Sequence, residues 1–185
     1  MTVRQVQMNN DTLNNNPHVS RADLSALHQD LFQWAYSLAG THAEDVLQHT
    51  YVLILEGKAR YDRQSTLKTW TFGVVRNVSR DLARRAERQR VGVAQLAVLD
   101  GQAVTDDLSL SGADADRRVQ MIDAAMAALS AQQREVLQLH TYREFSLSEC
   151  ADIMNLSLGT VRTHYHRAKA VLKQQLEDIH AEAER

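Results

Sequence analysis

The stretch SLSECADIMNLSLGTVRTHYHRAKAVL, residues 146–172, contains two start signals for a helix in close succession. Ser146 followed by Glu149 is the pattern of a capping box, and Ser157 stands before the next apolar run as a second cap. Asn155, between the two runs, is a residue type that tolerates the positive φ of a tight turn. The stretch therefore predicts a helix-turn-helix, whose core we expect to include Val161.

The second helix of this pair carries the charge pattern of a surface that binds a polyanion. Between Ile153 and Gln175 the sequence has Lys and Arg but no Asp or Glu. In a helix-turn-helix the second helix enters the major groove of DNA, where exposed side chains can meet base edges. The candidates for this contact are Thr160, Arg162, Thr163, His166 and Arg167. The alternative is a plain helical bundle with a solvated basic face.

A second basic pattern lies in the first half of the chain. Arg76, Arg80, Arg84 and Arg88 stand four residues apart, and such positions drift by about 40° per step around an α-helix. We expect them to form one continuous stripe that contacts a phosphate backbone, with a solvated face as the alternative.

The rest of the sequence predicts further helices and an all-α fold. Apolar residues at spacings of three and four indicate helices over residues 20–39, 41–56, 119–129 and 131–141, and a long helix from about Thr66 or Thr69 to Arg90. Thr41 with Glu44 predicts a capping box, and Gly40 and Gly57 predict helix ends. The single proline suits long helices.

Composition changes along the chain predict its domains. Residues 1–19 are polar and asparagine-rich and are expected to form a disordered tail. Residues 91–116, with glycines, serines and five Asp, predict a flexible acidic linker. Two small helical domains, residues 20–90 and 117–185, would lie on either side of this linker, the second with the helix-turn-helix.

The sequence argues against secretion and against an enzyme. Cys150 is the only cysteine, so no intrachain disulfide or cysteine-rich metal site can form. There is no signal-peptide pattern and no apolar run of about 18 residues, so we expect a cytoplasmic protein. His164 and His166 are too close in sequence to share a helix face, and Cys150 with His140 supplies only two ligands. We expect no metal, no cofactor and no catalytic residue.

Three stretches together resemble the extracytoplasmic-function sigma factors, sigma-70 type subunits of bacterial RNA polymerase. QREVLQLHTYREFSLSECADIMNLSLGTVRTHYHRAKAVLKQQL, residues 133–176, resembles the domain that reads the promoter −35 element. AEDVLQHTYVLIL, residues 43–55, resembles the helix that docks on the polymerase clamp. YDRQSTLKTW and TFGVVRNVSRDLARR, residues 61–85, resemble the loop and helix that melt and read the −10 element. Residues 65–78 are also similar to sigma factors of type III secretion genes.

This resemblance implies roles for particular residues. Those implied in binding core polymerase are Glu44, Asp45, Gln48 and His49, the last standing where the family usually has glutamate. Those implied in contacting the −10 DNA are Tyr61, Asp62, Lys68, Trp70, Arg76, Asn77, Arg80, Arg84 and Arg88. Residues of the loop can grip a base flipped from the stack, although DRQST, residues 62–66, differs from the usual D-P-E-x-G. Trp70 either fills the core or stacks on a base.

The predicted function is thus that of an alternative sigma factor. It would bind core RNA polymerase and promoter DNA, and the family implies an anti-sigma protein that covers its polymerase-binding surfaces. The alternative is a quorum-sensing-type helix-turn-helix regulator, in which the T-V-x-T-H pattern is also frequent. That alternative requires a ligand-binding or phospho-acceptor α/β domain, and the first 116 residues have no alternating strand pattern.

Overall fold

The computed structural model describes residues 16, 18–93 and 125–183, which fall into two helical units. The chain divides into a first unit of residues 1–104 and a second of residues 105–185. Within the described ranges every regular element is a helix and there is no strand. The all-α prediction with two small domains is confirmed.

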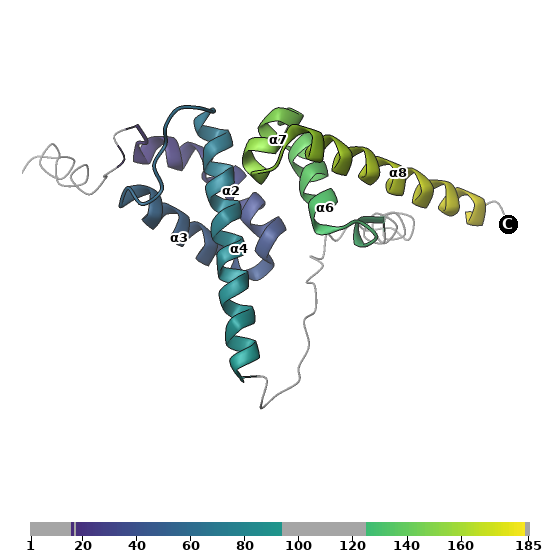
Figure 1. The fold of residues 1–185 in the computed structure, drawn as a ribbon, viewed down its shortest axis with the longest axis horizontal. Coiled ribbons are helices and arrows are strands. Elements are labelled where there is room, and N and C mark those ends of the chain that lie inside the picture. Colours follow the sequence, from purple (N-terminus) through teal and green to yellow (C-terminus); the bar gives the residue numbers. More distant parts are fainter. Residues whose placement is uncertain (1–15, 17, 94–124, 184–185) are drawn as a thin grey trace, which may run out of the picture. The chain divides into compact units, whose positions relative to one another are not determined.

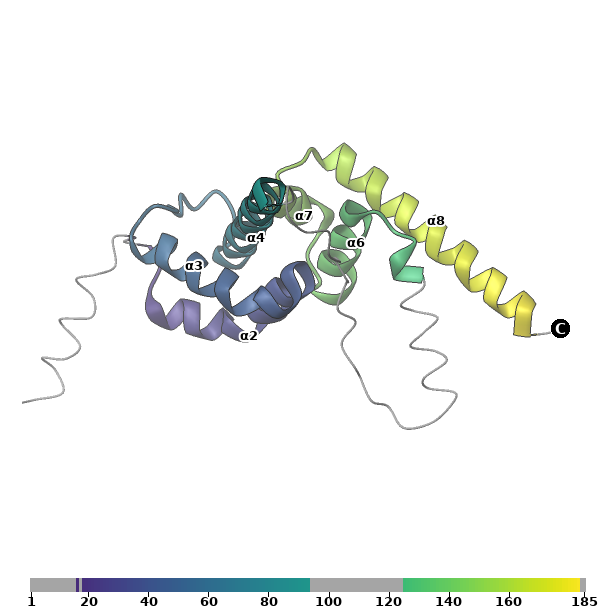
Figure 2. The same cartoon turned by 90° about the horizontal axis from the view of Figure 1, so that it is seen from below.

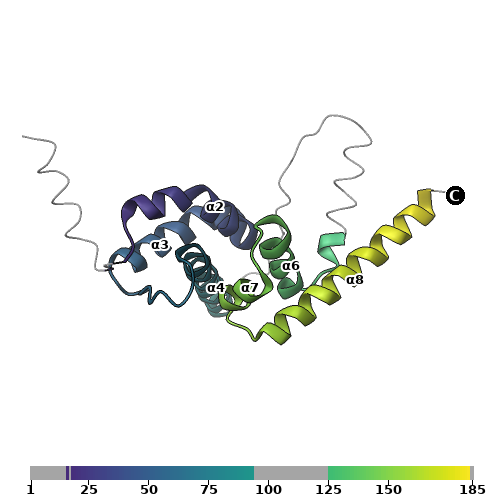
Figure 3. The same cartoon turned by 90° about the horizontal axis from the view of Figure 1, so that it is seen from above.

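The first unit is built from three helices, α2 (Arg21–Ala39), α3 (Ala43–Leu55) and α4 (Leu67–Val93). Helices α2 and α3 lie side by side, and α4 crosses both before its C-terminal part extends beyond them (Figures 1, 2 and 3). The crossing holds the core, where the Trp34 and Phe72 rings lie 6.0 Å apart and are fully buried. The Trp34 Nε1–H donates to the Phe72 carbonyl at 3.2 Å, which satisfies the buried indole and ties α2 to α4.

The boundaries of these helices have local causes. Ser20 and Asp23 form a capping box before α2, and the hydrogen bonds from Ser20 lower the pKa of the Asp23 carboxyl. Gly40, with φ of 55°, ends α2, and Gly57, with φ of 70°, follows α3. Thr66 caps α4, because its Oγ1 accepts from the Thr69 N–H at 3.1 Å.

The predicted capping box of Thr41 and Glu44 is wrong. A 3₁₀ turn, η1 (Gly40–His42), joins the two helices, and α3 begins at Ala43 after His42, which makes no side-chain cap. The tight turn places Thr41 inside a helical segment, so its hydroxyl is not at the N-cap of α3. His42 instead lies 3.7 Å from the Asp45 carboxylate in the first turn of α3.

The second unit contains α6 (Ala131–Leu137), a π-helical turn η2 (Gln138–Tyr142), α7 (Leu147–Met154) and α8 (Leu158–Ala183). Ser130 caps α6 in a box with Gln133. The predicted helix over 131–141 is thus an α-helix that widens into a π turn. The core consists of fully or almost fully buried apolar side chains, namely Val136, Leu139, Ile153, Met154, Val161 and Ala168. The predicted helix over 119–129 lies mostly outside the described residues, of which 125–127 are helical.

Two of the predicted domain boundaries differ from those of the structure. The predicted linker starts at residue 91, but α4 continues through Val93, and residues 94–116 lie outside the described residues. The predicted disordered tail extends too far, because Val19 is 2% exposed and packs in the core of the first unit. Residues 1–15 and 17 lie outside the described residues.

Candidate nucleic-acid and polymerase interfaces

The helix-turn-helix is held by local hydrogen bonds. The Ser146 N–H donates to the Glu149 carboxylate at 2.9 Å, and the Glu149 N–H donates to Ser146 Oγ at 3.2 Å. Asn155 ends α7 in the left-handed conformation, with φ and ψ both 51°. The Thr160 N–H then donates to Ser157 Oγ at 3.1 Å at the start of α8. The predicted capped pair with its tight turn is confirmed.

Packing fixes which face of α8 is turned outward. Val161 and Ala168 are fully buried, and Ala151 on α7 is small and 7% exposed, so the two helices can pack closely. Farther along α8, the Tyr165 ring meets the His140 ring edge-on at 4.8 Å. His140 is itself held by a 2.7 Å hydrogen bond between Nδ1 and the Phe145 carbonyl. Since these residues face the core, the remaining face of α8 is exposed.

All the side chains predicted to contact the −35 DNA lie exposed on α8: Thr160, Arg162, Thr163, His166 and Arg167. Two of them make local hydrogen bonds, Thr160 with Ser157 at 2.8 Å and Thr163 with the Gly159 carbonyl at 2.9 Å. Among the described residues, no acidic side chain forms an ion pair with either arginine. Their charges therefore remain available, but their contact with DNA stays a prediction.

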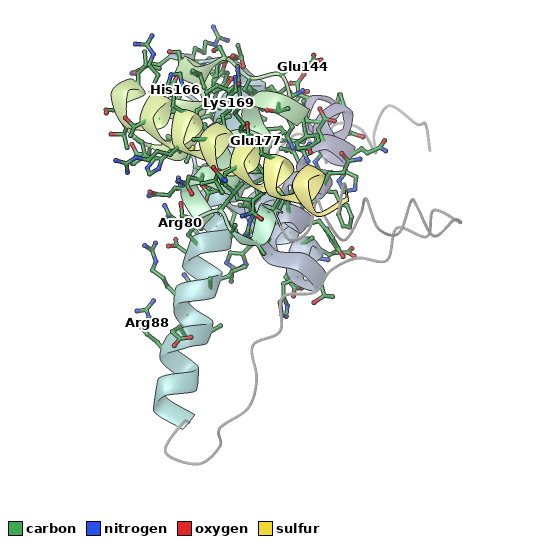
Figure 4. The ribbon with its side chains drawn as sticks, turned by 90° about the vertical axis from the view of Figure 1, so that its right-hand side faces the viewer. Arg80, Arg88, Glu144, His166, Lys169 and Glu177 are labelled. Carbon is green, nitrogen blue, oxygen red and sulfur yellow. The ribbon has the colours of Figure 1, made fainter. Side chains whose placement is uncertain are left out.

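Lys169 is a candidate that the sequence-based selection left out. Its Nζ lies 5.7 Å from the centre of the Tyr165 ring, and the residue is exposed on α8 (Figure 4). It stands three residues after His166 and seven after Arg162, so these three residues share a helix face. This spacing in the sequence would have been enough to include Lys169 among the −35 candidates.

The arginine stripe on α4 is shorter than predicted. Arg76 is 1% exposed, because it lies where α4 crosses the other two helices, between the buried Val75 and Ser79. It cannot reach a DNA phosphate, so its assignment to the −10 contact is wrong. Arg80, Arg84 and Arg88 are exposed on the part of α4 that follows.

These three arginines differ in their local partners. Figure 4 draws Arg80 and Arg88 on the same side of α4. Arg84 forms an ion pair with Asp81, and the Arg88 Nε–H donates to the Arg84 carbonyl at 3.1 Å. Because all of these groups are well exposed, the pair with Asp81 offsets little of the charge.

The loop before α4 brings some of the predicted −10 residues together. The Tyr61 hydroxyl donates to the Ser65 carbonyl at 2.6 Å, and the Tyr61 and Trp70 rings lie 5.3 Å apart. Asp62 is exposed and accepts from the Gln64 N–H at 3.1 Å. The loop thus forms a compact turn with Asp62 at its surface.

The other −10 candidates at the start of α4 lie in different environments. Trp70 is half-buried and packs against the cluster of Val19, Leu24 and Ile54, which fits its core-filling alternative. Lys68 forms a 2.9 Å ion pair with Asp30 on α2. Asn77 is exposed.

The predicted polymerase contacts form an exposed edge on α3: Glu44, Asp45, Gln48 and His49. A cavity of about 320 Å³ lies where α2 meets the C-terminal part of α3 and a second, of about 440 Å³, lies beside Asp45. Apolar side chains of α2, α3 and α4 line the second cavity, including Leu38, Val46 and Leu82, and Arg85 lies at the same cavity. This part of the surface combines charge with apolar area.

The described residues contain no cluster suited to binding a metal ion. They hold no group of three or more His, Cys, Asp or Glu side chains that could bind a metal ion. Cys150 is fully buried, and burial together with the Glu149 charge raises the pKa of its thiol to about 12. No helix in the described ranges is long and apolar enough to cross a membrane.

Comparison with known proteins places both units in one family. The Sigma-70 region 2 model matches residues 24–89, and the Sigma-70, region 4 model matches residues 119–172. The chain is 29% identical to the ECF RNA polymerase sigma factor SigX of Bacillus subtilis, over 84% of this chain and 82% of SigX. It is 31% identical to SigL of Mycobacterium tuberculosis, over 79% of this chain and 83% of SigL.

Two further matches bear on the predicted likenesses. The chain is 27% identical to the sigma factor HrpL of Pseudomonas syringae, over 72% of this chain and 73% of HrpL, which supports the likeness to sigma factors of type III secretion genes. The structure of the sigma factor RpoE in complex with the anti-sigma factor NepR from Bartonella quintana has the same fold. Its TM-score is 0.62 at 24% identity, covering 85% of this chain and 96% of RpoE.

Proposed function

This chain belongs to the extracytoplasmic-function sigma factors, which direct RNA polymerase to promoters through −10 and −35 elements, and we propose that it divides this work among three surfaces. The observation that carries the proposal is the order of the surfaces: an acidic edge on α3, an arginine-bearing α4 and a basic recognition helix. The quorum-sensing-type alternative is not favoured, because the first unit matches sigma region 2.

The −35 element is read by α8. Thr160, Arg162 and Thr163 lie on its first turns, at the helix N-terminus, and His166 and Arg167 follow on the next turn. Arginine can bond a guanine edge with two hydrogen bonds, so Arg162 and Arg167 carry most of the base discrimination. The threonines and the helix N-terminus position the helix on the phosphates.

The −10 element is contacted by the loop before α4 and by exposed side chains of α4. Asp62 is an exposed carboxylate of the loop that can accept hydrogen bonds from a flipped base, and Asn77 lies exposed on α4. Arg80, Arg84 and Arg88 meet the phosphate backbone without reading sequence. Tyr61 and Trp70 support the loop from beneath through their ring contact.

Core polymerase binds the acidic edge of α3. Glu44 and Asp45 accept hydrogen bonds from a basic partner, Gln48 supplies an amide, and the apolar cavity beside Asp45 offers area that a partner helix can cover. His49 cannot supply the charge of the family's usual glutamate, so this contact is weaker here.

We place the protein in the cytoplasm, without enzymatic activity, under the control of an anti-sigma protein. RpoE is a relative in fold that has been crystallised with its anti-sigma factor, NepR. Affinity purification under non-inducing conditions should recover a second small protein; recovery of core polymerase alone would contradict this form of control.

Asp45→Arg combined with Gln48→Ala tests the polymerase surface. Both side chains are exposed, so the fold should survive, while core binding should weaken by about 2–5 kcal/mol if the charge is buried against a basic partner. Gel filtration with core enzyme measures complex formation, and Gln33→Ala, an exposed position on α2, is the control. A full yield of complex with the double variant would rule out this surface.

A further inference from the structure

Asn16, His18 and Val19 lie against the loop that precedes α4. The Val19 N–H donates to the Asn16 carbonyl at 3.2 Å, which closes a turn just before α2. Val19 is buried with Leu24 and Ile54, and the loop residues Ala59 and Tyr61 pack against this same cluster. Asn16 and Val19 are thus part of the surface on which the loop rests.

Asn16 fixes the start of the loop. It is 2% exposed, and its Nδ2–H donates to the Ala59 carbonyl at 2.9 Å. The Ala59 N–H donates in turn to the Leu53 carbonyl at 2.9 Å. Ala59 is therefore held on one side by α3 and on the other by Asn16, and a buried amide that loses its partner is costly.

His18 holds the tip of the loop, next to Asp62. The Arg63 Nη2 lies 2.8 Å from His18 Nδ1, and because a guanidinium can only donate, the imidazole nitrogen accepts. Arg63 has φ of 63°, a left-handed conformation that a residue with a long side chain rarely adopts. The contact with His18 anchors this side chain while the backbone turns, which determines where the neighbouring Asp62 is presented.

From these three contacts we infer that Asn16, His18 and Val19 position the −10-reading loop, with Asn16 and His18 as positioning residues for promoter recognition. The inference rests on the proposed role of the loop in −10 contact. Through their contacts with Ala59 and Arg63, these residues act on the placement of Asp62 and Arg63. This adds a specificity determinant that lies outside the matched region, residues 24–89.

The test uses holoenzyme reconstituted from the full-length chain and core polymerase, on a target promoter and on variants with each base of the −10 element changed. His18→Ala should lower transcription from the intact promoter by about three- to tenfold, the effect of losing one ordinary hydrogen bond. It should also alter the relative preference among the −10 bases. His18→Asn keeps an acceptor at the position of Nδ1 and should restore both.

Further variants separate positioning from stability. His18 and Arg63 are both exposed, so His18→Ala should leave the unfolding transition of the first unit unchanged, whereas Asn16→Ala also removes a buried contact. Arg63→Ala in the His18→Ala background should cause no further loss, since the two act through one contact. His28→Ala, which removes an exposed 2.9 Å contact with Tyr51, is the matched control and should leave base preference intact.

The outcomes are distinct. Changed base preference with His18→Ala, rescue by His18→Asn and normal holoenzyme assembly would support the inference. Unchanged preference with His18→Ala and Asn16→Ala, while Asp62→Ala changes it, would overturn the positioning role alone. If Asp62→Ala also has no effect, the proposed −10 role of the loop is wrong and the positioning role with it.

Discussion

The recognition helix and the −10 loop are both candidate DNA-reading surfaces, but they are held in place by contacts of very different range. The helix-turn-helix depends on hydrogen bonds between close neighbours, such as Ser146 with Glu149 and Ser157 with Thr160. The loop depends on Asn16 and His18, which lie 43 and 45 residues before their partners Ala59 and Arg63. Local sequence patterns can therefore predict the recognition helix, but they do not indicate which residues support the −10 loop.

The arginines of the two units show the same difference. On α8, Arg162 and Arg167 are exposed, as the helix-turn-helix pattern predicts. On α4, the arginines follow a regular four-residue spacing, yet Arg76 is buried and Arg80 is exposed. A stripe is exposed only where no neighbouring helix crosses it, and the sequence around Arg76 does not contain that information.

The largest effect we expect is on Arg76, and it tests whether burial separates this residue from the rest of the stripe. Arg76→Ala should destabilise the first unit by about 2–5 kcal/mol, as for other large buried side chains. Arg80→Ala should leave stability nearly unchanged. Both tryptophans, Trp34 and Trp70, lie in the first unit, so urea unfolding followed by tryptophan fluorescence measures that unit alone. Equal stability of the two variants would contradict the burial of Arg76.

Arg162 tests the recognition helix. Arg162→Ala should weaken −35 recognition by about 1–3 kcal/mol if the guanidinium bonds a guanine edge, and should relax the base preference at one position. Transcription from promoters with single −35 substitutions measures this, with Arg80→Ala as a control for general loss of charge. Unchanged transcription from the target promoter would remove Arg162 from the DNA contact.

Ser146 and Thr41 form a matched pair for the two predicted capping boxes. Ser146→Ala should cost about 1 kcal/mol, because the hydroxyl caps α7. Thr41→Ala should change stability by less than about 0.5 kcal/mol, because Thr41 is exposed in a 3₁₀ turn and does not cap α3. Denaturation followed by far-ultraviolet circular dichroism measures the stability of both variants. An equal loss of stability for Thr41→Ala would indicate that Thr41 does cap α3.

Arg88 gives the smallest expected effect. Arg88→Gln should weaken promoter binding uniformly across −10 sequences and reduce the salt slope of binding by about 1. The comparison is with Asp62→Ala, which should change base preference with little change in slope. Binding measured over a series of salt concentrations separates the two, and a sequence-dependent effect of Arg88→Gln would contradict a pure phosphate contact.

Much of this protein follows from its sequence alone. The helix-turn-helix is determined by side chains that lie within a few residues of the backbone groups they bond. Ser146 and Ser157 cap its two helices, and Asn155 forms the turn between them. The all-α fold follows from the helical spacing of the apolar residues, and its division into two units follows from the polar stretch between them. The family resemblance was readable because its motifs occur in order along the chain.

Only the tertiary structure decided the rest. The burial of Arg76 results from the crossing of α4 over α2 and α3, and the absence of the Thr41 cap results from the tight turn between two packed helices. The burial of Asn16 and Val19 results from the hydrophobic cluster of Val19 and from a hydrogen bond between Asn16 and Ala59. Each depends on groups far apart in sequence that meet only once the helices pack, since burial is a property of the assembled unit and not of any short segment.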